Sequence, residues 1–320
     1  MNHKSKIYVA GHKGLVGSAI VKELKKKNFK KIITATRDQL DLTNQRNVLK
    51  FIKKKKPDFI IIAAAKVGGI YSNNKYKGQY IYENLMIQTN LIHSAYLCGV
   101  KNLIFLGSSC VYPRNCKQPI KEEYLLSGLL EKTNEPYAIS KITGIKMCET
   151  YNYQYKTEYK CLMPCNTFGP GDNYDEKNSH FLPALIKKIY LIKSGKKKQL
   201  MLWGTGKAKR EFIYVEDIAD ACIYFMNKKT KNFLINIGSG KDQSIIRIAN
   251  AALNEPQAHL YGPVLGNDDL RLELSQNWQK TYGGNLKANN IGITSGCNQA
   301  FCATIATIAS PHDNVIIPSP

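Results

Sequence analysis

No apolar stretch in this sequence approaches the roughly 20 residues that a membrane-spanning helix needs. The longest apolar run, FIIIAAA at 59–65, is short and β-branched, which is typical of a buried parallel strand. The segment 1–6 is polar and lacks the apolar core of a secretory leader. These absences predict a cytoplasmic protein with no membrane partner.

Paired cysteine motifs are also missing. The nine cysteines are scattered without a CxxC pair, and no histidine cluster accompanies Cys161 and Cys165 to complete a zinc site. This pattern argues against a disulfide framework and against a structural metal. We therefore expect no metal site, and we expect most of the cysteines to be small core side chains.

Acidic residues are scarce, since 24 Asp and Glu stand against 46 Lys and Arg, for a net charge of +22. Such a charge is compatible with nucleic-acid binding. The lysines, however, form short runs at 25–27, 53–56 and 196–198, and aromatic residues are not interleaved with them as a stacking platform requires. We interpret the charge as a solvated surface that attracts small anions, and we expect no nucleic-acid partner.

The positive charge stops near residue 250. Residues 250–320 contain three Lys or Arg and five Asp or Glu, so their net charge is −2, whereas residues 1–249 carry +24. The composition changes character at this point, which predicts a boundary there.

Strand-like and helix-like segments alternate through the first 160 residues. Strands are expected at 6–10, 32–35, 59–65, 102–107 and 159–163, and helices at 15–27, 44–53, 80–98 and 137–155. This alternation predicts an α/β fold with a doubly wound parallel Rossmann sheet.

A glycine-rich turn follows the first expected strand and opens the first expected helix. Gly11, Gly14 and Gly17 are spaced GxxGxxG. Glycine allows the tight turn, lets backbone N–H groups approach a pyrophosphate, and lets the helix pack close to the strand. The spacing in this context indicates a dinucleotide site, and it resembles that of the extended short-chain dehydrogenase/reductases.

The residue after the second strand selects the cofactor in such folds. An acid there binds a ribose 2′-hydroxyl, whereas an arginine accommodates a 2′-phosphate. Arg37 follows this strand, and Lys13 lies in the glycine loop, so the sequence favours NADP over NAD. Asp38 adjoins Arg37 and makes the choice less sharp, and Asp41 fits either cofactor.

The segment EPYAISK at 135–141 places Tyr137 and Lys141 four residues apart, hence on one helix face. A neighbouring ammonium is expected to lower the pKa of the tyrosine, which suits a general acid or base near neutral pH. In a dinucleotide fold, Ser108 of GSSCVYP (107–113) would hydrogen-bond the substrate carbonyl. Without that frame, a surface helix pair is the usual explanation of YxxxK.

Cys110 stands two residues beyond Ser108, so on a strand or extended turn both side chains would point the same way. A second proton-active group beside a ketone can remove a proton α to the carbonyl, although a packed thiol is the simpler reading. His180 precedes an expected helix where a substrate lobe should begin. A cysteine and a histidine on opposite faces of a sugar ring are what epimerisation requires.

Six segments together carry a resemblance to a known family. They read AAAKVGGI (63–70), FLGSSCVYP (105–113), TNEPYAISKITGIK (133–146), NSHFLPAL (178–185), WGTGKAKREFIYVEDIA (203–219) and INIGSG (235–240). From about residue 5 to about 249 the chain thereby resembles the GDP-L-fucose synthases. This family of homodimers uses NADPH to epimerise C3 and C5 and reduce C4 of GDP-4-keto-6-deoxy-D-mannose, giving GDP-L-fucose.

The resemblance implies a role for each matching residue. Tyr137, Lys141 and Ser108 match the reducing set, and Cys110 and His180 match the epimerisation pair. The implied NADP contacts are Gly11, His12, Lys13, Gly14, Leu15, Val16, Gly17, Arg37, Asp41, Leu106, Gly107, Ser108, Ser109, Tyr137, Lys141, Pro164, Cys165, Asn166, Thr167 and His180. The implied substrate contacts are Lys188, Trp203 and Arg210, of which the two cations suit a diphosphate.

The likeness ends near residue 249, where the family would continue with a substrate loop. Residues 256–320 instead resemble an N-terminal fragment of the fold-type I pyridoxal-phosphate aminotransferases, with YGPVLGNDDLR before a helix and ITSGCNQA as a phosphate-binding turn. Lys280 and Lys287 precede that turn and match no Schiff-base lysine, so we expect no aminotransferase activity.

The sequence therefore predicts an NADP-binding domain at 1–165, a partial substrate lobe at 166–249 interleaved with its sheet, and an unrelated segment at 250–320. The favoured function is GDP-L-fucose synthesis on a GDP-sugar substrate. The alternatives are a related nucleotide-sugar epimerase or reductase, and an NADP-binding remnant whose turnover is impaired by the missing loop.

Overall fold

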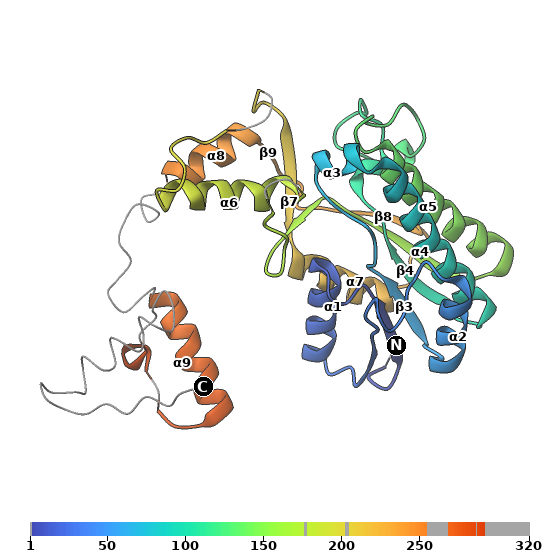
Figure 1. Cartoon of the computed structure of the whole chain (residues 1–320). Coiled ribbons are helices and arrows are strands. Elements are labelled where there is room, and N and C mark those ends of the chain that lie inside the picture. Colours follow the sequence, from blue (N-terminus) through green and yellow to red (C-terminus); the bar gives the residue numbers. More distant parts are fainter. Residues whose placement is uncertain (1, 176–177, 202–204, 255–267, 286, 292–320) are drawn as a thin grey trace, which may run out of the picture. The chain divides into compact units, whose positions relative to one another are not determined.

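The computed structural model describes residues 2–175, 178–201, 205–254, 268–285 and 287–291. The chain divides into two compact units, residues 1–250 and 251–320, which are described separately below (Figure 1). The first unit contains a large sheet, a small sheet and their helices.

Six parallel strands form the large sheet of the first unit. In spatial order they are β2 (Lys31–Ile33), β1 (Lys6–Ala10), β3 (Phe59–Ile62), β4 (Asn102–Leu106), β5 (Glu158–Pro164) and β8 (Leu234–Ile237). The central register aligns Val9 with Ile61, and Ile61 with Ile104. All four residues of β3 are buried, which explains why this strand is apolar on both faces.

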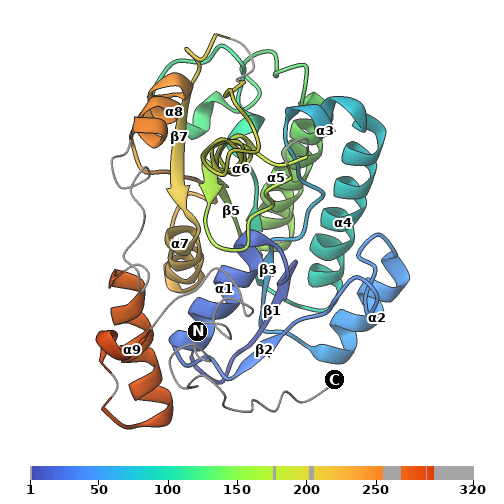
Figure 2. The same ribbon diagram turned by 60° about the vertical axis from the view of Figure 1, so that its left-hand side comes forward.

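Helices cover both faces of this sheet (Figure 1 and Figure 2). One layer consists of α1 (Leu15–Lys26) and α7 (Val215–Asn227), and the other of α2 (Gln45–Lys55), α4 (Lys77–Leu97) and α5 (Glu135–Tyr155). Side chains of β1 alternate between the layers, because Ile7 and Val9 pack under α1 and α7 whereas Tyr8 and Ala10 pack under the other helices. The doubly wound fold that the sequence predicts is confirmed.

A small sheet branches from the large one at the end of β5. It contains β6 (Asn166–Phe168), parallel to β7 (Lys209–Tyr214), which is antiparallel to β9 (Asp242–Ser244). With it come α6 (Phe181–Lys193) and α8 (Ile245–Asn254). The chain returns from β7 directly into α7 of the large sheet, so the small sheet is an excursion within one continuous unit.

The observed elements depart from the sequence pattern mainly at their ends. β3 stops at Ile62, and 63–65 leave the sheet although their apolar character continues the strand pattern. A short helix α3 (Ile70–Lys75) follows. The lysine runs lie at helix ends as expected, with Lys25 and Lys26 closing α1 and Lys53 to Lys55 closing α2, where they complement the helix dipole. None of the described helices is long and apolar enough to cross a membrane.

The second unit contains α9 (Asp268–Tyr282) and the 3₁₀ turn η4 (Ala288–Asn290). The buried Arg271 guanidinium joins them by donating to the carbonyl oxygens of Ala288 and Ile291, at 2.8–3.1 Å. The segment ITSGCNQA and residues 261–267 of YGPVLGNDDLR lie outside the described residues.

Candidate active site

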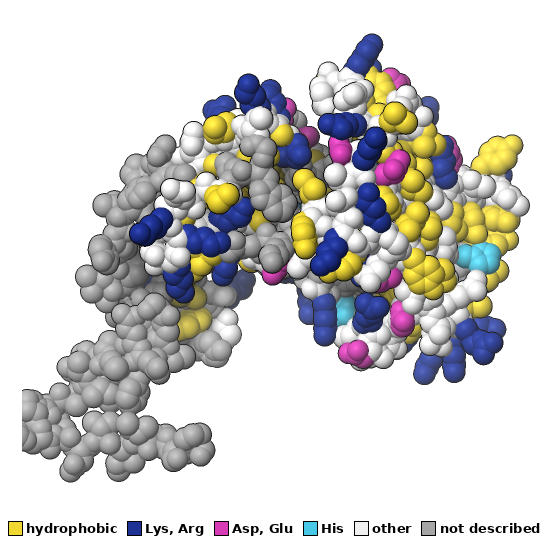
Figure 3. Space-filling model, turned by 45° about the horizontal axis from the view of Figure 1, so that its top comes forward, with side chains coloured by type: hydrophobic (Ala, Val, Ile, Leu, Met, Phe, Trp, Pro, Cys, Tyr) yellow, Lys and Arg dark blue, Asp and Glu magenta, His cyan; other side chains and the backbone are white. Residues whose placement is uncertain are grey.

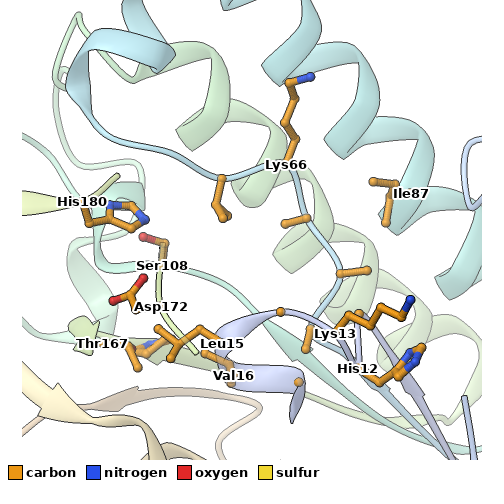
Figure 4. Close-up of a pocket in the computed structure, with 18 of the residues that line it drawn as sticks. His12, Lys13, Leu15, Val16, Lys66, Ile87, Ser108, Thr167, Asp172 and His180 are labelled. Carbon is orange, nitrogen blue, oxygen red and sulfur yellow. The ribbon is translucent and has the colours of Figure 1, made fainter. Parts of the chain in front are cut away.

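A cavity of about 590 Å³ opens at the carboxyl ends of the large sheet. It lies where β1 and β3 are adjacent, and the chain leaves these two strands toward opposite layers (Figure 4). Such a switch point is where doubly wound sheets bind nucleotides. The volume is in the usual range for a cofactor or ligand site.

The glycine loop after β1 forms the floor of the cavity. Gly11 adopts a positive φ of +86°, and a Cβ at this position would lie 2.6 Å from the backbone nitrogen of Ala64. A Cβ on Gly17 would overlap the carbonyl oxygen of Gly11. The spacing is therefore required for the helix start to approach β1 and β3 closely, which leaves the N-terminus of α1 facing the cavity.

Cationic side chains surround one end of the cavity. Lys13 lies beside the glycine loop, and Lys66 projects from the segment after β3 (Figure 4). Arg37 follows β2, and its guanidinium lies 3.8 Å from Glu83, whose carboxylate also accepts from Lys66 at 2.7 Å. The Asp41 carboxylate accepts from the N–H and hydroxyl of Thr43, and these bonds lower the pKa of Asp41.

Ser108 and Cys110 lie at the start of a 3₁₀ turn, η1 (Ser109–Val111), and not on the strand or extended turn that the sequence pattern suggested. β4 ends at Leu106, and Ser108 is the extended residue that caps the turn by accepting from the Cys110 N–H at 3.4 Å. Hydroxyl and thiol nevertheless remain close enough to interact, because Ser108 opposes the rise that burial causes in the pKa of Cys110.

Tyr137 and Lys141 lie in the first half of α5. Lys141 is buried, and its Nζ donates to the carbonyl oxygen of Leu106 at 2.8 Å. The same nitrogen lies 4.7 Å from the ring centre of Phe105 and 5.8 Å from that of Tyr137. Burial lowers the pKa of Lys141 to about 8, although Cys110 and Cys161 act in the opposite direction.

The expectation that Lys141 lowers the pKa of Tyr137 is wrong for this structure. Burial raises the pKa of Tyr137 well above its usual value, and Cys110 and Tyr80 add to the rise. The ammonium lies over the ring and is bonded to a carbonyl oxygen, so it does not reach the phenol oxygen as a hydrogen-bond donor. At neutral pH Tyr137 is therefore a proton donor.

Cys110 belongs to the same cluster through its electrostatic interactions with Tyr137 and Lys141. Burial raises the pKa of Cys110 to about 11, while Ser108 and Lys141 oppose the rise. Among the described residues that line the cavity are Ser108, Ser109 and Tyr137, but not Cys110. The thiol thus holds its proton at neutral pH and sits beside the lining residues.

His180 approaches the cluster from the small-sheet side, as the N-cap of α6. Figure 4 shows the side chains of His180, Ser108 and Asp172 gathered at one end of the cavity. Partial burial lowers the pKa of His180, and the nearby carboxylate of Asp172 opposes this change. A hydroxyl, a phenol, a thiol and an imidazole thus converge on one region, which provides donors and acceptors for proton transfer around a carbonyl.

Most of the predicted cofactor residues line this cavity. They are Gly11, His12, Lys13, Gly14, Leu15, Val16, Gly17, Arg37, Asp41, Gly107, Ser108, Ser109, Tyr137, Pro164, Cys165, Asn166, Thr167 and His180. Leu106 and Lys141 lie next to it and contact each other. The glycine floor and the cationic end fit an NADP molecule: the N-terminus of α1 would hold the pyrophosphate, and Lys13 and Arg37 would hold the 2′-phosphate.

The predicted substrate residues do not converge in the same way. The Lys188 ammonium donates to the carbonyl oxygen of Met201 at 2.9 Å, and the Arg210 guanidinium donates to that of Lys209 at 2.8 Å. Neither side chain is among the described residues that line the cavity. Trp203 lies outside the described residues.

The structure also adds lining residues that sequence reasoning missed. They are Ala35, Thr36, Leu40, Leu42, Thr43, Ala63, Ala64, Ala65, Lys66, Val67, Glu83, Ile87, Asp172, Phe181, Leu182, Pro183 and Phe212. The position of 63–67 directly after β3, at the switch point, was a usable signal. Asp172 had no such signal, because the sequence pattern predicts no strand for β6, which precedes it, and Asp172 belongs to no spaced motif.

Comparison with known proteins agrees with this geometry. The model of a family described as the NAD dependent epimerase/dehydratase family matches residues 7–238. GDP-L-fucose synthase 1 of Arabidopsis thaliana is 49% identical over 250 residues, which cover 78% of this chain and 77% of the relative.

Two solved structures superpose on the same region. A GDP-mannoheptose C4 reductase from Campylobacter jejuni with NADP bound has a TM-score of 0.71 and 42% identity, covering 79% of this chain and 84% of that one. A GDP-L-fucose synthetase from Naegleria fowleri bound to NADP has a TM-score of 0.72 and 28% identity, covering 78% and 77%.

Proposed function

The chain belongs to the NAD dependent epimerase/dehydratase family, and we propose that within this family it is an NADP-dependent GDP-L-fucose synthase. It would invert C3 and C5 and reduce C4 of GDP-4-keto-6-deoxy-D-mannose. The observation that carries the proposal is the grouping of Ser108, Tyr137 and His180 in the lining of one dinucleotide cavity, with Cys110 beside Tyr137. Reduction alone needs only the serine and the tyrosine, so the thiol and the imidazole support the additional epimerisation.

For the reduction, the bound NADPH supplies the hydride that adds to the C4 carbonyl carbon. Ser108 donates a hydrogen bond to the carbonyl oxygen, and Tyr137 gives that oxygen its phenolic proton. The raised pKa of Tyr137 keeps this proton in place until it is needed. The Lys141 ammonium, held near the ring by the Leu106 carbonyl, stabilises the phenolate that remains.

For the epimerisation, the ketone acidifies the protons on C3 and C5. The fraction of Cys110 that has released its own proton to solvent removes such a proton from one face, and the His180 imidazolium returns one to the other face. The nearby Lys141 ammonium favours the thiolate, although burial works against it. The two steps therefore share Lys141 but use different proton carriers.

A second candidate is a related GDP-4-keto-sugar reductase, and the 42% identity to the Campylobacter jejuni GDP-mannoheptose C4 reductase favours it. The two candidates differ in product: only a fucose synthase inverts C3 and C5. A third outcome is that the chain binds NADPH without turnover, because the partial lobe does not hold the sugar.

The test combines the full chain with NADPH and GDP-4-keto-6-deoxy-D-mannose, and records NADPH absorbance and the NMR spectrum of the product. GDP-L-fucose is the expected product. A product reduced at C4 but retaining the D-manno configuration at C3 and C5 would support the second candidate. NADPH binding without consumption would identify an inactive remnant and overturn the proposed function.

We also propose that the protein acts as a cytoplasmic homodimer. The outer side of α4 and α5 supports dimerisation, because Leu97, Tyr153 and Tyr155 are exposed there, Tyr153 at 81%. Hydrophobic side chains gather on the side of the molecule where these helices lie (Figure 3). Light scattering coupled to gel filtration should give twice the chain mass, and Tyr153→Glu should shift it toward the monomer.

For residues 250–320 we propose an aminotransferase-related fragment without activity. The support is the resemblance of YGPVLGNDDLR and ITSGCNQA and the change in charge near residue 250. After mixing with pyridoxal phosphate and borohydride reduction, peptide mapping should find no specific label at Lys280 or Lys287. A specific label at either lysine would contradict this proposal.

A further inference from the structure

One carboxylate oxygen at the catalytic end of the cavity lacks a partner. Asp172 lines the cavity, and its Oδ2 is buried without a hydrogen-bond partner in the described part of the chain. Its other oxygen, Oδ1, accepts from the backbone N–H of Asn173 at 2.8 Å. The loop therefore gives a hydrogen bond to only one of the two carboxylate oxygens. A buried acceptor without a partner costs free energy unless a ligand or a proton donor binds to it.

The loop that carries Asp172 is held in place by its own hydrogen bonds. The Asp172 N–H donates to the Gly169 carbonyl oxygen at 3.3 Å, and Asp175 Oδ1 accepts from the Asn178 N–H at 2.8 Å. The Asn178 carbonyl in turn accepts from the Gly69 N–H at 3.0 Å, which ties the loop to the segment after β3. Asp172 and the N-cap residue of α6 are thus fixed relative to each other.

That N-cap residue is His180, and it interacts electrostatically with Asp172. Among the described residues, Tyr137 also lines this end of the cavity, and the titratable side chains of Cys110 and Lys141 lie beside it. Among the described groups, Asp172 is the one that opposes the effect of burial on the pKa of His180. In return, His180 opposes the rise that burial causes in the pKa of Asp172, so each group favours the charged form of the other.

We propose that Asp172 is a positioning residue, whose free Oδ2 accepts a hydrogen bond from the His180 imidazolium and holds it as the acid for epimerisation. This inference rests on the proposed function, because it assigns a partner to the proton donor of that reaction. In this arrangement one imidazole nitrogen would bond Asp172, and the other would be left to protonate the sugar carbon. The carboxylate itself transfers no proton, and its charge keeps the imidazolium populated near neutral pH.

Asp172→Asn is the discriminating variant, because the amide oxygen can still accept from Asn173 whereas its NH₂ cannot accept from His180. Asp175→Asn is the matched control, since it makes the same change in the same loop and keeps an acceptor for Asn178. Asp172→Glu retains the charge and serves as the conservative variant.

The first measurement needs no turnover. The imidazole C2 proton of His180 is titrated by NMR in the full chain without cofactor, and its signal is assigned by its absence in His180→Asn. We expect the pKa of His180 to fall in Asp172→Asn, to stay at the wild-type value in Asp175→Asn, and to recover in Asp172→Glu. An unchanged pKa in Asp172→Asn overturns the inference, whatever the activity of the chain.

The second measurement follows deuterium uptake from D₂O at C3 and C5 of the keto sugar. Uptake by Asp172→Asn should fall on the order of 10-fold at neutral pH, with KM little changed. As the pH rises, deuterium uptake by Asp172→Asn should begin to decline at a lower pH than uptake by the wild type, because less of the imidazolium remains. A raised KM with an unshifted pH profile would mean that Oδ2 binds the sugar directly and would overturn the inference. If the wild type takes up no deuterium, the proposed function fails, while the NMR titration still decides the Asp172–His180 contact.

Discussion

The two sides of the candidate site are built differently. The cofactor side consists of residues at the ends of β1, β4 and β5 and the start of α5, and these converge on one cavity. The substrate side consists of α6 and β7, whose Lys188 and Arg210 donate to nearby carbonyl oxygens away from the cavity lining. A parallel sheet brings distant segments to one edge by its register alone, whereas the small sheet has only three strands to position its side chains. Proton chemistry and sugar binding should therefore respond to different substitutions.

The largest expected effect separates chemistry from binding on the cofactor side. Tyr137→Phe removes the proton donor for the carbonyl oxygen, so kcat for NADPH oxidation should fall by about 10³-fold. NADPH affinity, followed by fluorescence, should change little. Tyr153→Phe, on the same helix but exposed at its far end, is the control and should retain wild-type kcat. A Tyr137→Phe enzyme with normal turnover would remove Tyr137 from the mechanism.

The next effect concerns stability and has a defined sign. The pKa of Lys141 is about 8 in the folded chain against an ordinary value of 10.5, so between these pH values the unfolded chain binds the proton that the folded chain has lost. Stability from this group therefore rises with pH across that window, on the order of 3 kcal/mol in total. Lys141→Met should abolish this rise in urea unfolding free energies. If the unfolding free energies of the two proteins change with pH in the same way, folding does not lower the pKa of Lys141.

A smaller effect should divide the two reactions on the cofactor side. Cys110→Ser should reduce deuterium uptake at C3 and C5 by about 100-fold, about 2.7 kcal/mol, because a hydroxyl is a far weaker acid than a thiol. Ketone reduction should fall much less. Cys116→Ser, six residues further along, controls for loss of a thiol in the same region. Equal losses in both reactions would contradict separate roles for Ser108 and Cys110.

The smallest effect compares the two sides directly. Arg210→Ala should raise KM for the GDP-sugar about 10-fold and leave NADPH affinity unchanged, because one charge-assisted contact to the diphosphate is lost. Arg37→Ala should do the reverse, weakening NADPH but not NADH, since only the former carries a 2′-phosphate. If Arg210→Ala leaves KM unchanged, the small sheet does not bring this arginine to the substrate.

The parallel sheet, its paired helical layers and the glycine floor were all predictable, because each depends on local pattern: β-branched runs, helical periodicity, and glycines at fixed spacing. The cofactor residues beyond the glycine loop, such as Pro164 to Thr167 and His180, were implied by the family resemblance, and they line the same cavity. The end of β3 at Ile62 was not predictable from pattern, since 63–65 remain apolar after the chain has left the sheet. The 3₁₀ turn at Ser109–Val111 was likewise hidden, because the polar segment GSSC is equally compatible with an extended turn.

Sequence by itself determined which chemical groups are available and on which strand ends they lie: a serine and a cysteine after β4, a tyrosine and a lysine one helical turn apart, a histidine before α6. Only the tertiary structure decided their protonation states, because burial and neighbouring charges act through space. Burial leaves Tyr137 a proton donor despite its lysine neighbour, and it lowers the pKa of Lys141. The fold also brings Asp172 to His180, a pairing that no spacing in the chain encodes.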